Sequence, residues 1–181
     1  MLLPKKPKHK AVNMVIDEIL INSNDPKAVI SPVWWSVNIY DGEEKYEEDL
    51  KAFTVQQRYV FAIQCYVTEV NNGGHYQFYS NSAGIVWEDA LKGFEAIGAL
   101  KNAKIVKESA ARMGGKPSKN RDERNEQLEQ SSGDDGDCGL FEELDTLYYE
   151  SESDMYELLN AYIKANAKDF TFSGEVLMPA V

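Results

Sequence analysis

Apolar side chains recur at intervals of three or four residues along much of this chain. The pattern is clearest from Thr54 to Val70, where Thr54 and Gln57 also have the spacing of a helix capping box. The same spacing appears over 11–21, over 85–97 with a continuation to 113, and over 140–163. Such spacing puts apolar side chains on one helical face, which a partner helix can cover. We therefore expect an all-α protein, a single globular domain of about seven helices.

Several segments are less regular, and the sequence predicts breaks in them. Residues 29–40 are bulky and aromatic, and both a helix after Pro32 and a strand are compatible with them. Residues 41–49 have the composition of a charged linker, and Asn71-Asn72-Gly73-Gly74 should end the long helix. Further helix breaks are expected at Gly98 and at Ser151 or Ser153.

The chain divides into three parts by composition. Residues 1–10 are basic and should form a flexible tail, while 11–181 should form the helical domain. Within that domain, residues 114–139 carry almost no apolar side chains. Such a segment buries too little surface to offset its ordering entropy, so a flexible, exposed, acidic loop is expected. A solvated helical piece is expected around 121–130.

Location follows from what the sequence lacks. No apolar run approaches the roughly 20 residues that a membrane span needs, and the first ten residues do not follow the pattern of a secretory signal. We expect a cytoplasmic protein with no membrane partner. Cys65 and Cys138, the two cysteines of the chain, should then be free thiols.

Negative charge is concentrated in one part of the chain. Residues 1–121 carry a net charge of +2, whereas 122–157 carry 14 acidic side chains and one basic one, a net charge of −13. This disfavours direct nucleic-acid binding and favours a basic protein partner. The candidate partner-binding residues are Glu142, Glu143, Asp145, Glu150, Glu152, Asp154 and Glu157. The alternative is a solvated acidic face that keeps the protein soluble.

The seven carboxylates have a density close to that of DNA phosphates. On one helix, residues 142–157 would span about 24 Å, or one charge per roughly 3.4 Å, which is the phosphate spacing of a single DNA strand. The comparison requires one continuous helix, and the break expected at Ser151 or Ser153 argues against it.

Catalytic and metal chemistry have little support. His75 with Ser80, Ser82 or Cys65 is a conceivable dyad, but no spacing selects it, and His75 is expected to be a turn residue. The cysteines and histidines lack the paired spacings of a zinc site. The run Asp134-Asp135-Gly136-Asp137 lacks the alternating ligands of a calcium loop. We expect no metal, no cofactor and no enzymatic activity.

A short polar motif carries a family resemblance. The run from Asn72 to Gly84, NGGHYQFYSNSAG, resembles the signature of a bacterial all-helical family of DNA-mimic proteins. The likeness extends through Ala90, Leu91, Ile97-Gly98-Ala99 and Ala103 and resumes at 141–145 and 159–166, so it covers roughly residues 50–170. Residues 1–45 lie outside it.

The resemblance implies a helical, often dimeric protein. In the founding example of that family, carboxylates take the place of DNA phosphates and bind a transcription factor. We interpret the signature residues as structural: Asn72, Gly73 and Gly74 fit a helix-ending turn, and Gln77 and Asn81 would share a helix face and bond nearby backbone. The signature residues are Asn72, Gly73, Gly74, Gln77, Asn81 and Gly84.

Three functional hypotheses follow. The first is a non-enzymatic acidic protein, a candidate DNA mimic, that binds a basic DNA-binding protein or transcription regulator. The second is an immunity or complex-subunit protein that binds through the aromatic surface of Trp34, Trp35 and Tyr40. The third is an enzyme whose site lies near His75.

Overall fold

The computed structural model describes residues 9–132 and 139–179. In these residues the chain forms ten α-helices, one 3-10 helix and two strands. The elements in chain order are β1 His9–Ile16, α1 Glu18–Ile21, α2 Pro26–Val29, α3 Ser31–Ser36, α4 Glu43–Leu50, α5 Val55–Ser80, η1 Ser82–Val86, α6 Trp87–Ala96, α7 Leu100–Arg112, α8 Arg121–Ser132, α9 Glu142–Ala165, α10 Ala167–Phe170 and β2 Phe172–Pro179. The fold is largely helical as predicted, with more helices than the seven expected and a small sheet that was not expected.

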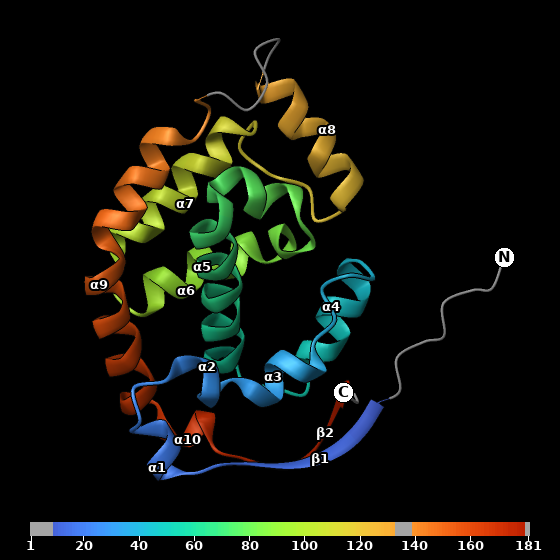
Figure 1. Ribbon diagram of the computed structural model, residues 1–181, viewed down its shortest axis with the longest axis vertical. Helices are drawn as coiled ribbons and strands as arrows, with labels where there is room; N and C mark the ends of the chain where they lie inside the picture. Colours follow the sequence, from blue (N-terminus) through green and yellow to red (C-terminus); the bar gives the residue numbers. More distant parts are fainter. Residues whose placement is uncertain (1–8, 133–138, 180–181) are drawn as a thin grey trace, which may run out of the picture.

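The long helix α5 runs through the centre of the molecule (Figure 1). α9 and α7 lie along one side of it, α4 and α8 lie on the other, and the short helices and the sheet close the lower end. Aromatic rings meet in the core, where Tyr66 of α5 makes edge contacts at 5.0 Å with Phe78, 5.4 Å with Phe94 and 5.6 Å with Tyr148. Offset and edge contacts of this kind stabilise cores beyond simple area burial.

The start of α5 confirms the predicted capping box. The Gln57 amide N–H donates to Thr54 Oγ1 at 3.1 Å, and the Thr54 N–H donates back to Gln57 Oε1 at 3.0 Å. The predicted end at residues 71–74 is confirmed for the first part of α5, because two helical runs meet there at a kink. The backbone leaves helical geometry at Gly73 and Gly74, but the helix resumes and continues to Ser80. The glycines therefore produce a kink inside one long element.

The helix predicted over 11–21 is wrong, because most of this segment is strand β1. β1 pairs antiparallel with β2, with Ile16 opposite Phe172 and Val12 opposite Val176. Inward-facing and outward-facing side chains alternate, and Ile16 and Val176 are buried. The local sequence pattern is compatible with a helix as well as a strand. The strand forms because its pairing partner, β2, comes from residues far away in the sequence. The strand begins at His9, so residues 9 and 10 do not belong to the predicted tail, and residues 1–8 lie outside the described part.

Residues 41–49, expected to be a linker, form most of α4. Tyr46 of α4 is buried and its hydroxyl donates to Asp89 Oδ2 at 2.7 Å. Arg58 of α5 bridges Asp89, at 2.8 Å, and Glu47, at 2.7 Å. A segment this charged folds against the body because its ionic partners come from α5 and α6.

The break expected at Ser151 or Ser153 does not occur, and α9 is continuous from Glu142 to Ala165. Ser151 is buried, accepts a hydrogen bond from Asn102 Nδ2 of α7 at 2.9 Å and donates to the Tyr148 carbonyl at 2.9 Å. A serine that satisfies its hydroxyl in this way remains inside a helix and does not cap one.

The remaining predictions of secondary structure agree more closely with the structure. A helix does follow Pro32, in α3, and Gly98, with φ +79°, separates α6 from α7. The helical piece expected around 121–130 is α8, but it is not wholly solvated, because Arg124 and Leu128 are buried. The run 134–137 and Cys138 lie outside the described residues.

Candidate functional site

The kink in α5 is built around Asp145, the third acidic residue of α9. The kink frees the first N–H groups of the second half of the helix, and Asp145 Oδ1 accepts a hydrogen bond from the His75 N–H at 2.9 Å. Gly74 has φ +70°, which favours glycine, and a Cβ there would lie 2.9 Å from Asp145 Cγ. Asp145, predicted to face a partner, is turned inward and caps a helix across the α5–α9 contact.

His75 is not the turn residue that was expected. Its ring is fully buried, Nδ1 is hydrogen-bonded to Asp145 Oδ1, and Nε2 lies 2.6 Å from the Tyr66 hydroxyl. With Nδ1–H donating to the carboxylate, Nε2 accepts from Tyr66, so a neutral ring is fully satisfied. A hollow of about 690 Å³ lies beside the kink, lined by Asn72, Gly73, Gly74 and Asp145 among others, but not by the His75 ring.

Two of the three nucleophiles that the sequence offered beside His75, Ser80 and Cys65, are not arranged to work with it. The Ser80 hydroxyl donates to the Gln77 carbonyl at 3.2 Å. Cys65 is buried, and burial raises the pKa of its thiol, which keeps it protonated. Neither side chain is hydrogen-bonded to His75 in the described residues, so the arrangement there is that of a packed core.

Gln77 and Asn81 act together as the sequence suggested, but on a different acceptor. Gln77 Nε2 and Asn81 Nδ2 both donate to Glu69 Oε2, each at 2.8 Å. We expected bonds to nearby backbone; a carboxylate from the first half of α5 takes their place. The clamp crosses the kink and ties the two halves of the helix together.

Gly84 makes room for a buried arginine. A Cβ at Gly84 would lie 2.8 Å from Arg124 Cζ and 2.9 Å from the Phe78 carbonyl oxygen. Arg124 comes from α8, in the segment expected to be a solvated loop, and its side chain is completely buried. The sequence offered no signal for this contact, because a lone arginine among charged neighbours normally lies in solvent.

Three of the seven candidate carboxylates on α9 have partners within the protein. Besides Asp145, Glu152 accepts a hydrogen bond from Asn71 Nδ2 at 2.7 Å, and Glu143 pairs with Arg112 at 3.1 Å. Glu143 is nevertheless exposed, as are Glu142, Glu150, Asp154 and Glu157. The structure therefore divides the predicted set between an inward flank and an outward one.

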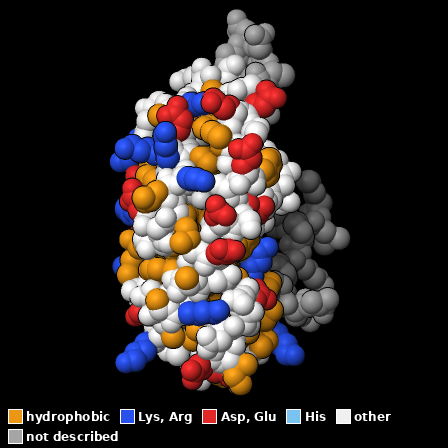
Figure 2. Space-filling view, turned by 90° about the vertical axis from the view of Figure 1, so that its left-hand side faces the viewer, with side chains coloured by type: hydrophobic (Ala, Val, Ile, Leu, Met, Phe, Trp, Pro, Cys, Tyr) orange, Lys and Arg blue, Asp and Glu red, His pale blue; other side chains and the backbone are white. Residues whose placement is uncertain are grey.

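On the outward flank, Glu143, Glu150, Asp154 and Glu157 form one stripe. With a rise of about 1.5 Å per residue their axial separations are about 10, 6 and 4.5 Å, wider than the roughly 3.4 Å between phosphates of a DNA strand. A hollow of about 650 Å³ between α7 and α9 is lined by Glu143 and Glu150 and also by Lys101, Lys104 and Arg112. Figure 2 shows this side of the molecule, with basic side chains lying among acidic ones.

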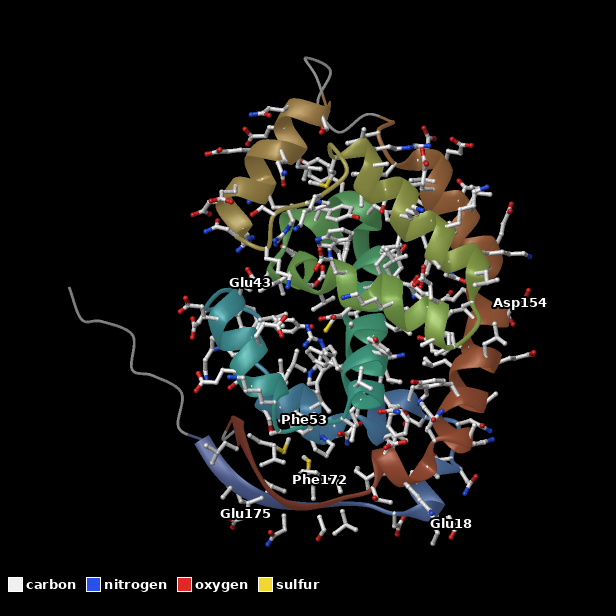
Figure 3. All side chains as sticks on the ribbon, turned by 180° about the vertical axis from the view of Figure 1, so that it is seen from behind. Glu18, Glu43, Phe53, Asp154, Phe172 and Glu175 are labelled. Carbon is white, nitrogen blue, oxygen red and sulfur yellow. The ribbon has the colours of Figure 1, made fainter. Side chains whose placement is uncertain are left out.

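A second acidic set lies on the other side of the molecule. α8 exposes Asp122, Glu126 and Glu129, and α4 exposes acidic side chains including Glu43. Viewed from behind in Figure 3, Glu43 and Asp154 lie on opposite sides of the central helix α5. A segment that is continuous in sequence is thus divided in space, and α4, which was interpreted as a linker, contributes to the acidity of the α8 side.

The three aromatic residues of the second hypothesis do not form one surface. Trp34 and Trp35 are each 38% exposed and line a hollow of about 410 Å³ with Thr68 of α5. Tyr40 is 77% exposed but lines a different hollow, beside Arg121. Only the tryptophan pair remains as a candidate aromatic site.

Taken together, these features define a helical protein with a kinked central helix, a hydrogen-bonded network of Tyr66, His75 and Asp145, and exposed carboxylates on two sides. A family model described as DMP19-like protein matches residues 51–166. The chain therefore belongs to the DMP19-like family, a family of DNA-mimic proteins. A search of the curated proteins found no match, and a search of the solved structures found none. None of the described helices combines the length and apolarity needed to cross a membrane.

Proposed function

We propose that this protein is a non-enzymatic DNA mimic that binds a basic DNA-binding protein through the exposed carboxylates of α8 and α9. Membership of the DMP19-like family carries the proposal. The chain supplies the chemistry that such a role needs, since Glu150, Asp154 and Glu157 are exposed on one helix and have no hydrogen-bonded or ionic partner among the described residues.

The physical basis is electrostatic complementarity. A DNA-binding surface carries Lys and Arg side chains placed to neutralise phosphates, and a row of exposed carboxylates offers them the same sign of charge. Such contacts accelerate association and fix orientation, and they weaken as salt rises. On α9 the lysines of α7 partly offset the carboxylates, whereas on α8 the outward side chains Asp122, Glu126 and Glu129 form an unbroken acidic row.

Three matched variants test the proposal and locate the surface. One neutralises α9 (Glu150→Gln, Asp154→Asn, Glu157→Gln), one neutralises α8 (Asp122→Asn, Glu126→Gln, Glu129→Gln), and the control neutralises three exposed carboxylates elsewhere (Glu18→Gln, Glu95→Gln, Glu175→Gln). Asp145 and Glu152 are left unchanged because they hold the fold. Every variant removes the same amount of charge. A difference in binding between variants therefore shows which surface contacts the partner.

The measurement is capture of DNA-binding proteins from a bacterial extract, followed by elution with salt and with duplex DNA. At about 0.2–1 kcal/mol for each of three exposed pairs, the variant that neutralises the binding surface should bind a captured regulator about 3- to 140-fold more weakly. The control should bind like the wild type. Capture that resists both salt and duplex DNA, or that is equal in all variants, would refute the proposal.

The tryptophan hollow supports a second candidate, an immunity or complex-subunit protein. Trp35 is 38% exposed and lines this hollow, and indole side chains are enriched at the centres of interfaces. Under this hypothesis Trp35→Ala should abolish capture of a partner that the charge variants still bind. Partner capture that is unchanged in Trp35→Ala would exclude it.

A further inference from the structure

α8 is attached to the protein in an unusual way for a helix. Leu128 is its one buried apolar side chain, and the other buried residue is Arg124. A surface helix normally docks through an apolar stripe, and a single leucine gives α8 very little of one. Polar contacts on its inner face must therefore supply most of the attachment.

Arg124 makes four of these contacts and is the buried side chain among them, while Gln127 and Arg121 make others nearer the surface. Arg124 Nε donates to the Tyr79 carbonyl at 2.7 Å, and Nη2 donates to the Asn81 carbonyl at 2.7 Å. Nη1 donates to the carbonyls of Ser118, at 2.7 Å, and Lys119, at 3.3 Å. One guanidinium thus joins the C-terminal end of α5, the loop before α8 and α8 itself.

The charge of this guanidinium is balanced by dipoles, since no carboxylate lies within ion-pair distance of it in the described residues. Burial, and then the neighbouring Arg121, lower the pKa of Arg124 to about 10, so it is still a cation at neutral pH. The last carbonyls of a helix carry partial negative charge and favour a cation. Arg121 adds a second donor there, from Nε to the Ser80 carbonyl at 2.9 Å.

The geometry points to a positioning role: we propose that Arg124, in the space left by Gly84, clamps α8 so that Asp122, Glu126 and Glu129 form a fixed acidic row. The inference rests on the proposed function, because it says how part of that binding surface is held. A surface ordered in advance loses less conformational entropy when a partner docks. Lysine cannot replace arginine here, since a single ammonium lacks the planar fork that reaches carbonyls in several directions.

The test compares Arg124→Lys with Arg121→Lys, which keeps the same charge but changes the exposed arginine of the pair. Backbone amide hydrogen exchange is measured over α8, 121–132, and over α6, 87–96. Binding is measured with protamine, an arginine-rich DNA-binding protein. We expect Arg124→Lys to speed exchange in α8 but not in α6, and to weaken protamine binding by about the same factor as neutralising the three α8 carboxylates. Arg121→Lys should change both readouts far less.

Specific outcomes would overturn the clamp. Unchanged exchange in α8 of Arg124→Lys refutes it, and so does equal acceleration in α8 and α6, because that is a general loss of stability. If Arg124→Lys fails to fold, Arg124→Gly is examined with added methylguanidinium, and failure of that cation to restore protection of α8 refutes the clamp. Absence of protamine binding by the wild type counts against the proposed function, while hydrogen exchange still decides the clamp.

Discussion

Replacing Gly74 by alanine tests whether the kink in α5 exists to admit Asp145. Gly74 has φ +70° and ψ −172°, so any L side chain there is strained by about 1–3 kcal/mol, offset by about 0.4–1 kcal/mol from the stiffer unfolded chain. The added Cβ would also lie 2.9 Å from Asp145 Cγ. Asp145 would have to withdraw and leave the N–H of buried His75 without its acceptor, at about 1.5–3 kcal/mol for a bond to a charged group.

Gly98→Ala is the matched control. Gly98 has φ +79°, and a Cβ there meets nothing within 4 Å. The free energy of unfolding of Gly98→Ala should therefore fall only by the net cost of backbone strain, about 1 kcal/mol. The free energy of unfolding of Gly74→Ala should fall by about 3 kcal/mol, the sum of the backbone strain and the lost hydrogen bond to His75. In a protein of this size the difference of about 2 kcal/mol corresponds to about 4–8 °C in Tm.

The assay is urea unfolding followed by far-UV circular dichroism, with Tm as a second readout. The double variant Gly74→Ala with Asp145→Ala removes the clash, so its loss of stability should be smaller than the sum of the two single losses. The reasoning is refuted if Gly74→Ala and Gly98→Ala are equally destabilised, or if the double variant shows additive losses.

Three further predictions follow from buried polar groups. Because burial raises the pKa of the Cys65 thiol, a Cys138→Ser variant should react with Ellman's reagent only after denaturant is added; fast reaction of the native protein would contradict the packing. Arg58→Met leaves the Asp89 carboxylate buried without its cation and should lower the free energy of unfolding by about 3–5 kcal/mol, against almost no change for exposed Lys51→Met. Hydrogen bonding to Arg58 lowers the pKa of Glu47 below its ordinary value of 4.5. As pH falls, the unfolded chain therefore binds a proton at Glu47 before the folded chain does. The stability that this pair contributes above about pH 4.5 should be lost in acid. Glu47→Gln should flatten that pH profile in urea unfolding, and an unchanged profile would argue against the pair.

The elements that the sequence predicted well depend on neighbouring residues. The Thr54–Gln57 capping box and the break at Gly98 are decided within one helical turn or by one backbone angle. Their outcome can be deduced from local chemistry. The helix after Pro32 belongs to the same group, because proline suits the first turn of any helix.

The wrong predictions share the opposite property. β1 needs β2 from the other end of the chain, α4 needs Arg58 and Asp89, and the unbroken α9 needs Asn102 beside Ser151. In each case a local pattern was compatible with two structures, and a partner distant in sequence selected one of them. The predicted acidic set could not be divided into inward and outward flanks for the same reason.

What this sequence determined by itself is the helical class, the family signature and the amount of negative charge, since periodicity, motif and composition are properties of the linear chain. The tertiary structure decided how that charge is used. It turned Asp145 inward to cap the kink at Gly74, buried Arg124 in the space beside Gly84, and placed the carboxylates of α8 and α9 on opposite sides. The physical reason is that a charged side chain takes its role from the polar groups that reach it in space, and packing sets those groups.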